Sequence, residues 1–451
     1  MVVQKFGGTS VADPAAVQRL IEIARAGRAD GRGPVVVVSA LSGVTDVLLT
    51  IAAEAGASRT DVALGHVDRL RERHLAMVQA LVADGDRGEL TRVVEGQFTE
   101  LGAVVRALAV LREVSVRTLD VIAAMGELLS SRIIAAALRH AGLPGEWVDA
   151  RRAVVTNDDH TRAVPMMRET TAAMRAAVTP LLDAGRIPVM GGFVGATAEG
   201  HTTTLGRGGS DYSGAIVGAA LGASEIQIWT DVDGMLTADP RLIPQSKLVT
   251  HLSFAEAAEL AYFGAKVLHP STIHPAVERN IPVRILNSRK PDGQGTLITE
   301  DPDAQGGPLT AMAAKRDLTV VDITSSRMLM AYGFLRQVFE VFERFQTAVD
   351  VVTTSEVSVS VTVDDRRHLD AIVEALSECG NVSVEPDMAL LCAVGDRLRA
   401  DPAIAARVIR VLEEVPLRMI SQAASRRNIT VIMRQADLPH AMHRLHEEFF
   451  Q

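Results

Sequence analysis

The chain has 451 residues, of which 47% are hydrophobic and 22% are charged. At about 150 residues per domain, this length predicts two to four domains, and the composition is that of a folded globular protein. The chain carries 46 basic and 55 acidic residues, a formal charge of −9, which argues against a nucleic-acid-binding surface. Aromatic residues make up only 4%, so platforms for stacking single-stranded bases are scarce too.

Two cysteines, Cys379 and Cys392, form no CxxC motif and no disulfide framework, as expected in a reducing compartment. Residues 1–6 read as a short apolar strand and lack the basic and apolar regions of a signal peptide. Apolar runs such as residues 35–38 are far shorter than the roughly 20 residues of a membrane span. We therefore expect a cytoplasmic protein with no membrane partner.

The first half of the chain alternates predicted strands with predicted helices. Asp13 is typical of a helix N-cap, Pro14 suits the first helical position, and apolar residues then recur at helical spacing until Gly27. Further strands are predicted at 2–6, 35–40, 187–190, 225–230 and 281–287, and further helices at about 61–111 and 127–140. This order predicts an α/β fold with a mostly parallel sheet sandwiched by helices.

A stretch rich in Pro, Gly and Asp at about 288–316 marks a predicted domain boundary. Beyond it, the order of strands and helices approximates βαββαβ twice, which is typical of two ferredoxin-like modules. We therefore predict one domain over residues 1–295, a first module over 313–390 and a second over 391–451.

Residues 5–10, KFGGTS, follow the first strand and precede a helix. Glycines let backbone N–H groups approach a ligand closely, and together with a lysine and a helix N-terminus they are typical of a phosphate-binding loop. The loop is not a Walker A motif, because G-x-x-x-x-G-K-[ST] is absent. The alternative is an ordinary tight turn.

A second glycine-rich loop, TTLGRGGSD at residues 203–211, also reads as an anion cradle. Three glycines cost conformational entropy, for which anion binding offers a reason. Asp211 alternatively acts only as the cap of the helix predicted at 216–221. Two such loops suggest a ligand set with a triphosphate and a carboxylate.

A third segment, WTDVDGMLTADPR at residues 229–241, lies at the C-terminal end of a predicted strand, where ligands bind in open α/β sheets. Its carboxylates lack the EF-hand spacing, which excludes that type of calcium site, and Asp233 with Gly234 alternatively forms a simple turn. Further on, Lys266 stands in an apolar context, which is unusual for a purely solvated lysine.

Together with LSFAEAAELAYFGAKVLHP at residues 252–270, these segments resemble the signatures of the aspartate kinases. The resemblance covers nearly the whole chain, whose C-terminal modules resemble ACT domains, and it is nearest to the monofunctional, lysine-sensitive type. It implies the amino-acid-kinase fold and transfer of the ATP γ-phosphoryl group to the β-carboxylate of L-aspartate. The product would be 4-phospho-L-aspartate, the first intermediate of the aspartate-family amino-acid pathway, and a fused homoserine dehydrogenase is not expected.

The resemblance also implies roles for individual residues. The implied catalytic residues are Lys5, Asp211 and Lys266. The implied aspartate-binding residues are Ser39, Thr45, Glu127, Arg207 and Ser210. The implied ATP contacts are Lys5, Gly7, Gly8, Thr9, Thr230, Asp231, Leu236, Arg241, Lys266 and Val267. Mg²⁺ is expected to arrive with ATP, and no protein metal site is expected.

Some of these residues also fit purely structural roles. Glu127 stands early in its predicted helix, where a carboxylate also favours the helix dipole. Ser39 and Thr45 also fit a simple turn. Leu236 departs from the family pattern, because the nearest subtype often has Tyr at that position.

The ACT modules imply regulation by an amino acid, expected to be L-lysine, and a homodimer or higher homo-oligomer. The implied allosteric residues are Met328, Gly333, Phe334, Leu335, Val349, Asp350, Ser355 and Glu356. Free N–H groups at the helix start after Gly333 suit a carboxylate, and Asp350 suits an ammonium group. Met330, Ala331 and Ala348 depart from the family pattern, which leaves threonine or no effector as alternatives.

The residues leave two other functions open. One is an amino-acid sensor built on an inactive kinase domain, against which the intact set of polar site residues argues. The other is a kinase of a different carboxylate or carbamate, which the ACT modules and the expected aspartate pocket disfavour.

Overall fold

The computed structural model describes residues 1–31, 33–206, 208–264, 270–300, 307–325, 332–396, 398, 400–422 and 425–451. The chain forms two compact units. The first comprises Met1–Met235, Thr250–Phe254 and Val267–Pro302, and the second comprises Leu236–Val249, Ala255–Lys266 and Asp303–Gln451.

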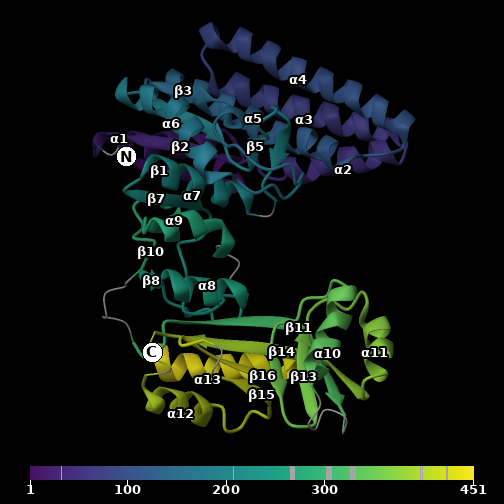
Figure 1. Cartoon of the computed structure of the whole chain (residues 1–451). Coiled ribbons are helices and arrows are strands. Elements are labelled where there is room, and N and C mark those ends of the chain that lie inside the picture. Colours follow the sequence, from purple (N-terminus) through teal and green to yellow (C-terminus); the bar gives the residue numbers. More distant parts are fainter. Residues whose placement is uncertain are drawn as a thin grey trace. The chain divides into compact units, whose positions relative to one another are not determined.

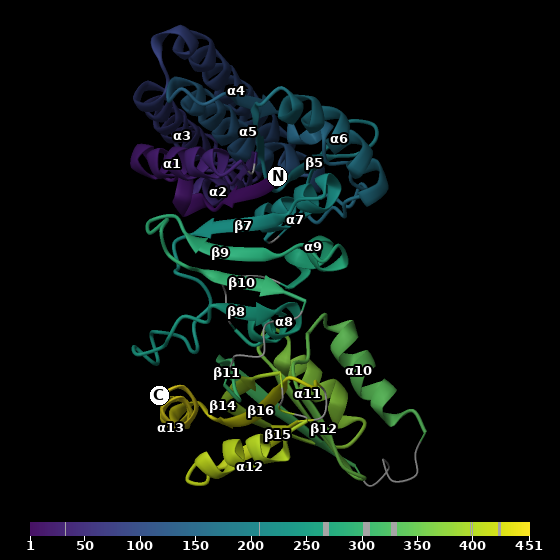
Figure 2. The same ribbon diagram turned by 90° about the vertical axis from the view of Figure 1, so that its left-hand side faces the viewer.

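An eight-stranded sheet forms the centre of the first unit (Figure 1, Figure 2). Its order is β3-β4-β2-β1-β7-β9-β10-β8, and its neighbours are parallel except for β9 and β10. The strands are β1 (Val2–Phe6), β2 (Pro34–Val38), β3 (Gly145–Val148), β4 (Ile187–Gly191), β7 (Glu225–Thr230), β8 (His251–Ser253), β9 (Val283–Asn287) and β10 (Thr296–Thr299). The predicted, mostly parallel sheet is confirmed. Both β1 and β2 are buried at every position; β2 is apolar throughout, whereas β1 also carries Gln4 and Lys5.

Helices cover both faces of this sheet. They are α1 (Pro14–Ala29), α2 (Val44–Gly56), α3 (Thr60–Leu81), α4 (Asp84–Leu111), α5 (Val116–His140), α6 (Met167–Asp183), α7 (Gly209–Leu221) and α9 (His274–Glu278), with short 3₁₀ turns at η1 (Gly8–Val11), η2 (Ala150–Arg152) and η3 (Pro270–Ile273). Phe6 shares a core with α1, α2 and α5, whereas its neighbour Lys5 lies against α7 on the other face. This alternation is the ordinary two-residue period of a strand.

The helical region before Glu127 differs from its prediction. The stretch expected at 61–111 is two helices, α3 and α4, which separate at residues 82–83, and α5 begins at Val116, well before the predicted start. α5 is long and apolar enough to cross a membrane, but 89% of its most apolar window is buried inside the structure, as in a core helix. Elements that were not predicted include β3, α6, β8, β10 and the hairpin of β5 (Val194–Ala196) and β6 (Thr202–Thr204).

The second unit is built on a six-stranded antiparallel sheet in the order β12-β13-β11-β14-β16-β15. Its strands are β11 (Ala311–Thr324), β12 (Val352–Thr354), β13 (Ser358–Val363), β14 (Asn381–Val394), β15 (Leu417–Ser421) and β16 (Asn428–Arg434). Its helices are α10 (Phe334–Arg344), α11 (Leu369–Ser377), α12 (Pro402–Val411) and α13 (Leu438–Phe450), with a 3₁₀ turn at η5 (Gln435–Asp437), and most of α8 (Phe254–Tyr262) also belongs to this unit.

Two long strands join the two predicted modules into one sheet. β11 and β14 have 14 residues each. The later part of β11, 318–324, pairs with 381–388 of β14, while its first part, 311–315, pairs with 390–394. The second βαββα set therefore lacks a closing strand of its own, and the start of β11 supplies it. Each half nevertheless has a separate apolar core, one with α10 and α11 and one with α12 and α13. The residue bounds given for the modules remain predictions.

Two segments from the first 295 residues fold into this second unit. Residues 236–249 place Ala238 and Ile243 in the core with α12 and α13. On α8, Glu256 accepts a hydrogen bond from Thr310 at 2.5 Å and Glu259 accepts one from Asn428 at 2.6 Å. Residues that directly follow the segment 229–235 in the sequence are thus anchored in the second unit.

Candidate active site

The loop after β1 carries the first group of predicted site residues. The Gly7 N–H donates to the Trp229 carbonyl at 2.9 Å, which ties the loop to the end of β7. A Cβ on Gly8 would lie 3.3 Å from the Ala40 carbonyl oxygen, tighter than an ordinary contact. The two glycines therefore let the loop run closely between the ends of β7 and β2.

Lys5 and Asp211 form an ion pair beneath this loop. Lys5 is 5% exposed, and its Nζ lies 2.5 Å from Asp211 Oδ1. A buried ammonium needs such a partner. α7 approaches the sheet closely because two of its residues are glycines. A Cβ on Gly214 would lie 3.2 Å from the Lys5 side chain, and a Cβ on Gly218 would lie 2.5 Å from the Ile226 side chain.

The position of Asp211 in α7 decides between its two predicted roles. The N-cap is Gly208, which makes no side-chain cap bond, and Asp211 lies inside the first turn. The interpretation of Asp211 as a simple cap is therefore wrong.

Glu127 is a buried acid in the middle of α5. It is 3% exposed, and its Oε2 atom has no hydrogen-bond partner among the described residues. Burial raises the pKa of this carboxyl to about 8. Gly191 makes room for it, since a Cβ there would lie 2.9 Å from Glu127 Cβ. Because α5 begins at Val116, the helix-dipole interpretation of Glu127 is wrong.

A pocket of about 420 Å³ brings the Gly7–Gly8 loop and Glu127 together, whereas Lys5 and Asp211 are not among its lining residues. It is lined by eight of the predicted site residues: Gly7, Gly8, Thr9, Ser39, Thr45, Glu127, Ser210 and Thr230. The Ser39 hydroxyl donates to the Ser210 hydroxyl at 3.0 Å, which joins the end of β2 to the start of α7. Ser39 and Thr45 therefore stand on a pocket wall rather than in a turn remote from it.

Several predicted site residues lie outside this pocket. Asp231 follows Thr230, whose hydroxyl donates to its carboxylate at 3.3 Å. Leu236 and Arg241 belong to the segment that folds with the second unit, where exposed Arg241 pairs with Asp239 at 2.7 Å. Their nucleotide contacts stay predictions. The residues Arg207, Lys266, Val267 and Met328 lie outside the described residues.

The predicted allosteric residues surround the start of α10 and the strand β12. Gly333 is the N-cap of α10 with φ of +83°, a conformation that favours glycine. Phe334 is buried, Leu335 is 41% exposed and Val349 packs beside the core of this half. Ser355 bonds to Ser358 at 2.7 Å, and Glu356 is exposed.

Asp350 already has an ammonium partner within the chain. Lys315 Nζ lies 2.8 Å from its carboxylate and 2.6 Å from that of Asp364. Burial still raises the pKa of Asp350, against the lowering effect of Lys315. An effector ammonium at Asp350 would therefore meet an occupied carboxylate.

One wall of the pocket was not predicted. Phe193 lines it after Gly191 and Gly192, with a left-handed φ of +63°. Its backbone N–H donates to the Ser213 hydroxyl at 2.8 Å, which holds this conformation against α7. A strand followed by two glycines, as in residues 5–8, was the available signal.

Comparisons with known proteins agree with this geometry. The sequence profile of the amino acid kinase family matches residues 1–287, and that of an ACT domain matches residues 391–449. Aspartokinase 3, chloroplastic, of Arabidopsis thaliana is 37% identical over 466 residues, covering 100% of this chain and 81% of the relative.

Two crystal structures of aspartokinase III from E. coli match over 100% of both chains. The complex with aspartate and ADP, in the R-state, gives a TM-score of 0.81 at 35% identity. The complex with lysine and aspartate, in the T-state, gives 0.83 at 34% identity. With this coverage, the pocket at the carboxyl ends of β1, β2 and β7 and the ACT fold of the second unit, the chain belongs to the aspartokinase family and is an ATP-dependent kinase of aspartate.

Proposed function

We propose that the pocket between the Gly7–Gly8 loop and Glu127 binds L-aspartate and the terminal phosphate of ATP, and that γ-phosphoryl transfer to the β-carboxylate takes place there. The observation that carries this proposal is the pairing, in one pocket, of a glycine-rich phosphate loop with a buried carboxylate oxygen that lacks a partner among the described residues. The first feature suits an anion and the second suits an ammonium group.

The chemistry fits these residues. The β-carboxylate of aspartate is ionised near pH 7, so the attacking oxygen needs no general base. Phosphoryl transfer then depends on positioning and on neutralising charge. Lys5 supplies the positive charge, and Asp211 holds its ammonium group in place. The carboxylate oxygen forms the new bond to phosphorus as the bond to the ADP oxygen breaks.

Magnesium is proposed to enter as part of MgATP. Within the part of the chain that the structure describes, no three His, Cys, Asp or Glu side chains are grouped as metal ligands. ATP phosphates supply hard oxygen ligands, and Mg²⁺ commonly keeps several waters with one or two carboxylates. Asp211, whose carboxylate pairs with Lys5, is proposed to meet such a water.

Trapping the product tests the activity. Incubation with MgATP, L-aspartate and hydroxylamine is expected to give aspartyl hydroxamate, because hydroxylamine attacks the acyl phosphate. A panel containing glutamate, acetate and carbamate separates this activity from other carboxylate or carbamate kinases. Absence of hydroxamate with aspartate would reject the proposed activity in favour of an amino-acid sensor.

Feedback inhibition by L-lysine is proposed at the α10–β12 end of the second unit. Its support is the N-terminus of α10, which suits a carboxylate, together with the lysine complex of a structural relative. Isothermal calorimetry with lysine, threonine and methionine compares the candidate effectors directly. Lysine is expected to release heat and to inhibit; heat from threonine alone would reassign the effector.

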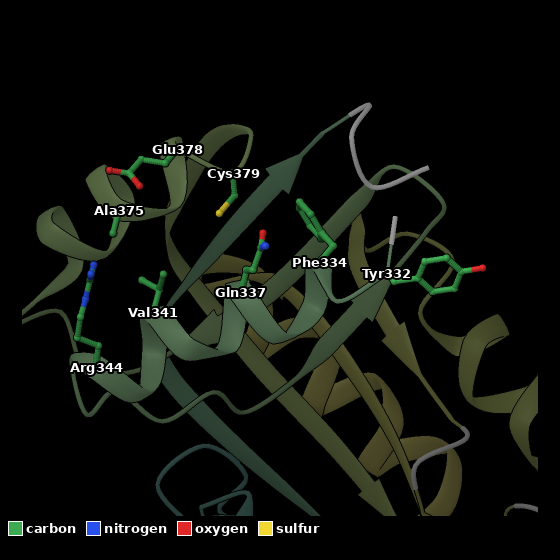
Figure 3. Close-up of a pocket in the computed structure, with 8 residues that line it drawn as sticks. All are labelled: Tyr332, Phe334, Gln337, Val341, Arg344, Ala375, Glu378 and Cys379. Carbon is green, nitrogen blue, oxygen red and sulfur yellow. The ribbon is translucent and has the colours of Figure 1, made fainter. Parts of the chain in front are cut away.

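We also propose a homodimer through the same half of the second unit. Tyr332 is fully exposed and points away from the groove between α10 and α11 (Figure 3). On α10, Leu335 and Phe339 are 41% and 37% exposed and stand one turn apart. Such an apolar face favours a partner surface. Sedimentation of the chain and of Phe339→Glu tests this, with a shift toward monomer expected for the variant.

A further inference from the structure

Asp120 is a fully buried carboxylate that does not line the pocket. It lies on α5 two turns before Glu127 and is 0% exposed. Its oxygens accept hydrogen bonds from His160 Nδ1 at 2.6 Å, from the Thr161 N–H at 3.0 Å and from the Thr204 hydroxyl at 2.5 Å. A buried carboxylate is tolerated only when donors satisfy it in this way.

These bonds join three segments that are distant in sequence. Thr204 is the last residue of β6, from which the second glycine-rich loop continues. Its carbonyl also accepts the Ala163 N–H at 2.9 Å, so β6 and residues 160–163 are held side by side. Asp120 thus fixes both of them to the helix that carries Glu127.

The glycine-rich loop rests on the segment that Asp120 holds. Gly206 has φ of +75°, and a Cβ there would lie 3.2 Å from the Thr161 carbonyl oxygen. Two residues later in the chain, Gly208 is the N-cap of α7, whose first turn carries Ser210 on the pocket wall. A displacement of Thr161 or Thr204 would therefore move the loop relative to Glu127.

We propose that Asp120 is a positioning residue for aspartate recognition, acting through Thr204 and Thr161 on Gly206 and on the start of α7 at Ser210. The proposal rests on the assignment of the pocket to aspartate. α5 then contributes twice to one ligand: Glu127 contacts its ammonium group, and Asp120 sets the distance from Glu127 to the opposite wall. Misplacement by about 1 Å costs up to about 100-fold in turnover for well-oriented groups.

The sharpest test removes one hydroxyl. Thr204→Val keeps the shape of the side chain and deletes only the bond to Asp120. Its matched control is Thr156→Val, which deletes a buried hydroxyl that bonds to Thr203 Oγ1 at 2.7 Å. Thr203 is the neighbour of Thr204 on β6, so the control perturbs the same strand without touching Asp120. Steady-state kinetics with each substrate and thermal melting are measured for both variants.

For Thr204→Val we expect the KM for aspartate to rise about tenfold while the KM for ATP changes less than about twofold. Thr156→Val is expected to change both KM values less than about twofold, even if its melting temperature falls by as much as that of Thr204→Val. Equal kinetics for the two variants, or parallel changes in both KM values of Thr204→Val, would overturn the proposal.

Two more variants separate this inference from the pocket assignment. Asp120→Asn keeps one acceptor oxygen, so its KM for aspartate is expected between those of the unmodified chain and Asp120→Ala. Glu127→Gln tests the pocket itself. If Glu127→Gln raises the KM for aspartate and Thr204→Val does not, the positioning role fails and the pocket stands; if neither raises it, the pocket assignment fails as well.

Discussion

Glu127→Gln tests whether the buried Glu127 carboxyl group destabilises the fold and is also needed to bind the substrate. Burial raises the pKa of Glu127 to about 8 from an ordinary value of 4.5. Between pH 4.5 and pH 8 the unfolded chain has released this proton and the folded chain retains it. The free energy of unfolding therefore falls as the pH rises through this window.

The size of the effect follows from the two pKa values. Linkage gives a cost below about 1 kcal/mol at about pH 5 and of about 4 kcal/mol at about pH 8, relative to a neutral side chain of the same shape. Glutamine is such a side chain. Glu127→Gln is therefore expected to be more stable than the unmodified chain by about 4 kcal/mol at about pH 8, and by less than about 1 kcal/mol at about pH 5.

Substrate binding is expected to change in the opposite sense. An ammonium ligand selects the ionised form, which is about one in eleven molecules at about pH 7 and about half at about pH 8 when the pKa is about 8. The KM for aspartate of the unmodified chain should then fall about fivefold across this pH step. The Gln variant should have a much higher KM without this pH dependence.

The assays are denaturant unfolding and initial rates at several pH values for both proteins, since their difference cancels the other titrating groups. If the difference in unfolding free energy between the unmodified chain and Glu127→Gln is the same at about pH 5 and about pH 8, the reasoning about the buried acid is refuted. A KM that falls with pH equally in both proteins would refute the contact between Glu127 and the substrate ammonium group.

Four further substitutions probe the rest of the molecule. Lys5→Ala should lower kcat by at least about 1,000-fold. Asp211→Asn should lower kcat by less, because the amide oxygen still holds the Lys5 ammonium group. Near-normal turnover in a folded Lys5→Ala protein would exclude the role of Lys5 in charge neutralisation. Gly126→Ala places a Cβ 2.7 Å from Ala40 Cβ and should lower stability by about 1–3 kcal/mol, measured by thermal melting, so an unchanged melting temperature would contradict the close packing of α5. Lys315→Met removes the ammonium group that pairs with the carboxylates of Asp350 and Asp364, and it should lower the lysine concentration needed for half-inhibition. Unchanged inhibition would show that these two carboxylates do not belong to the effector site.

The sequence predicted the parallel sheet because its local signals agree. β2 is apolar throughout and β1 is mostly apolar, and Asp13 caps α1 by accepting from the Ala16 N–H at 2.8 Å. Where local signals are weak, the prediction failed. α6 contains Pro180 and only a few buried residues, and β10 lies in a glycine-rich stretch that reads as a linker.

The predicted start of α5, at Glu127, missed a local signal. Ser115 is the N-cap of this helix and accepts from the Thr118 N–H at 3.2 Å, so the helix begins at Val116. Only the burial of Asp120 depends on distant segments, because Thr204 and residues 160–161 satisfy its carboxylate. The start at Val116 places Glu127 in mid-helix, which changed its interpretation.

Residue types and spacing along the chain determined the fold class, the two glycine-rich loops and the polar residues able to handle phosphate and amino acid, because strand alternation, capping and turn chemistry act over a few residues. Tertiary structure alone decided that Asp211 pairs with Lys5, that Glu127 has a raised pKa, and that β11 completes the sheet of both ACT halves. Each of these depends on burial or pairing between segments that are distant in the sequence. Desolvation and hydrogen bonding between distant segments arise only when the chain folds and brings those segments together.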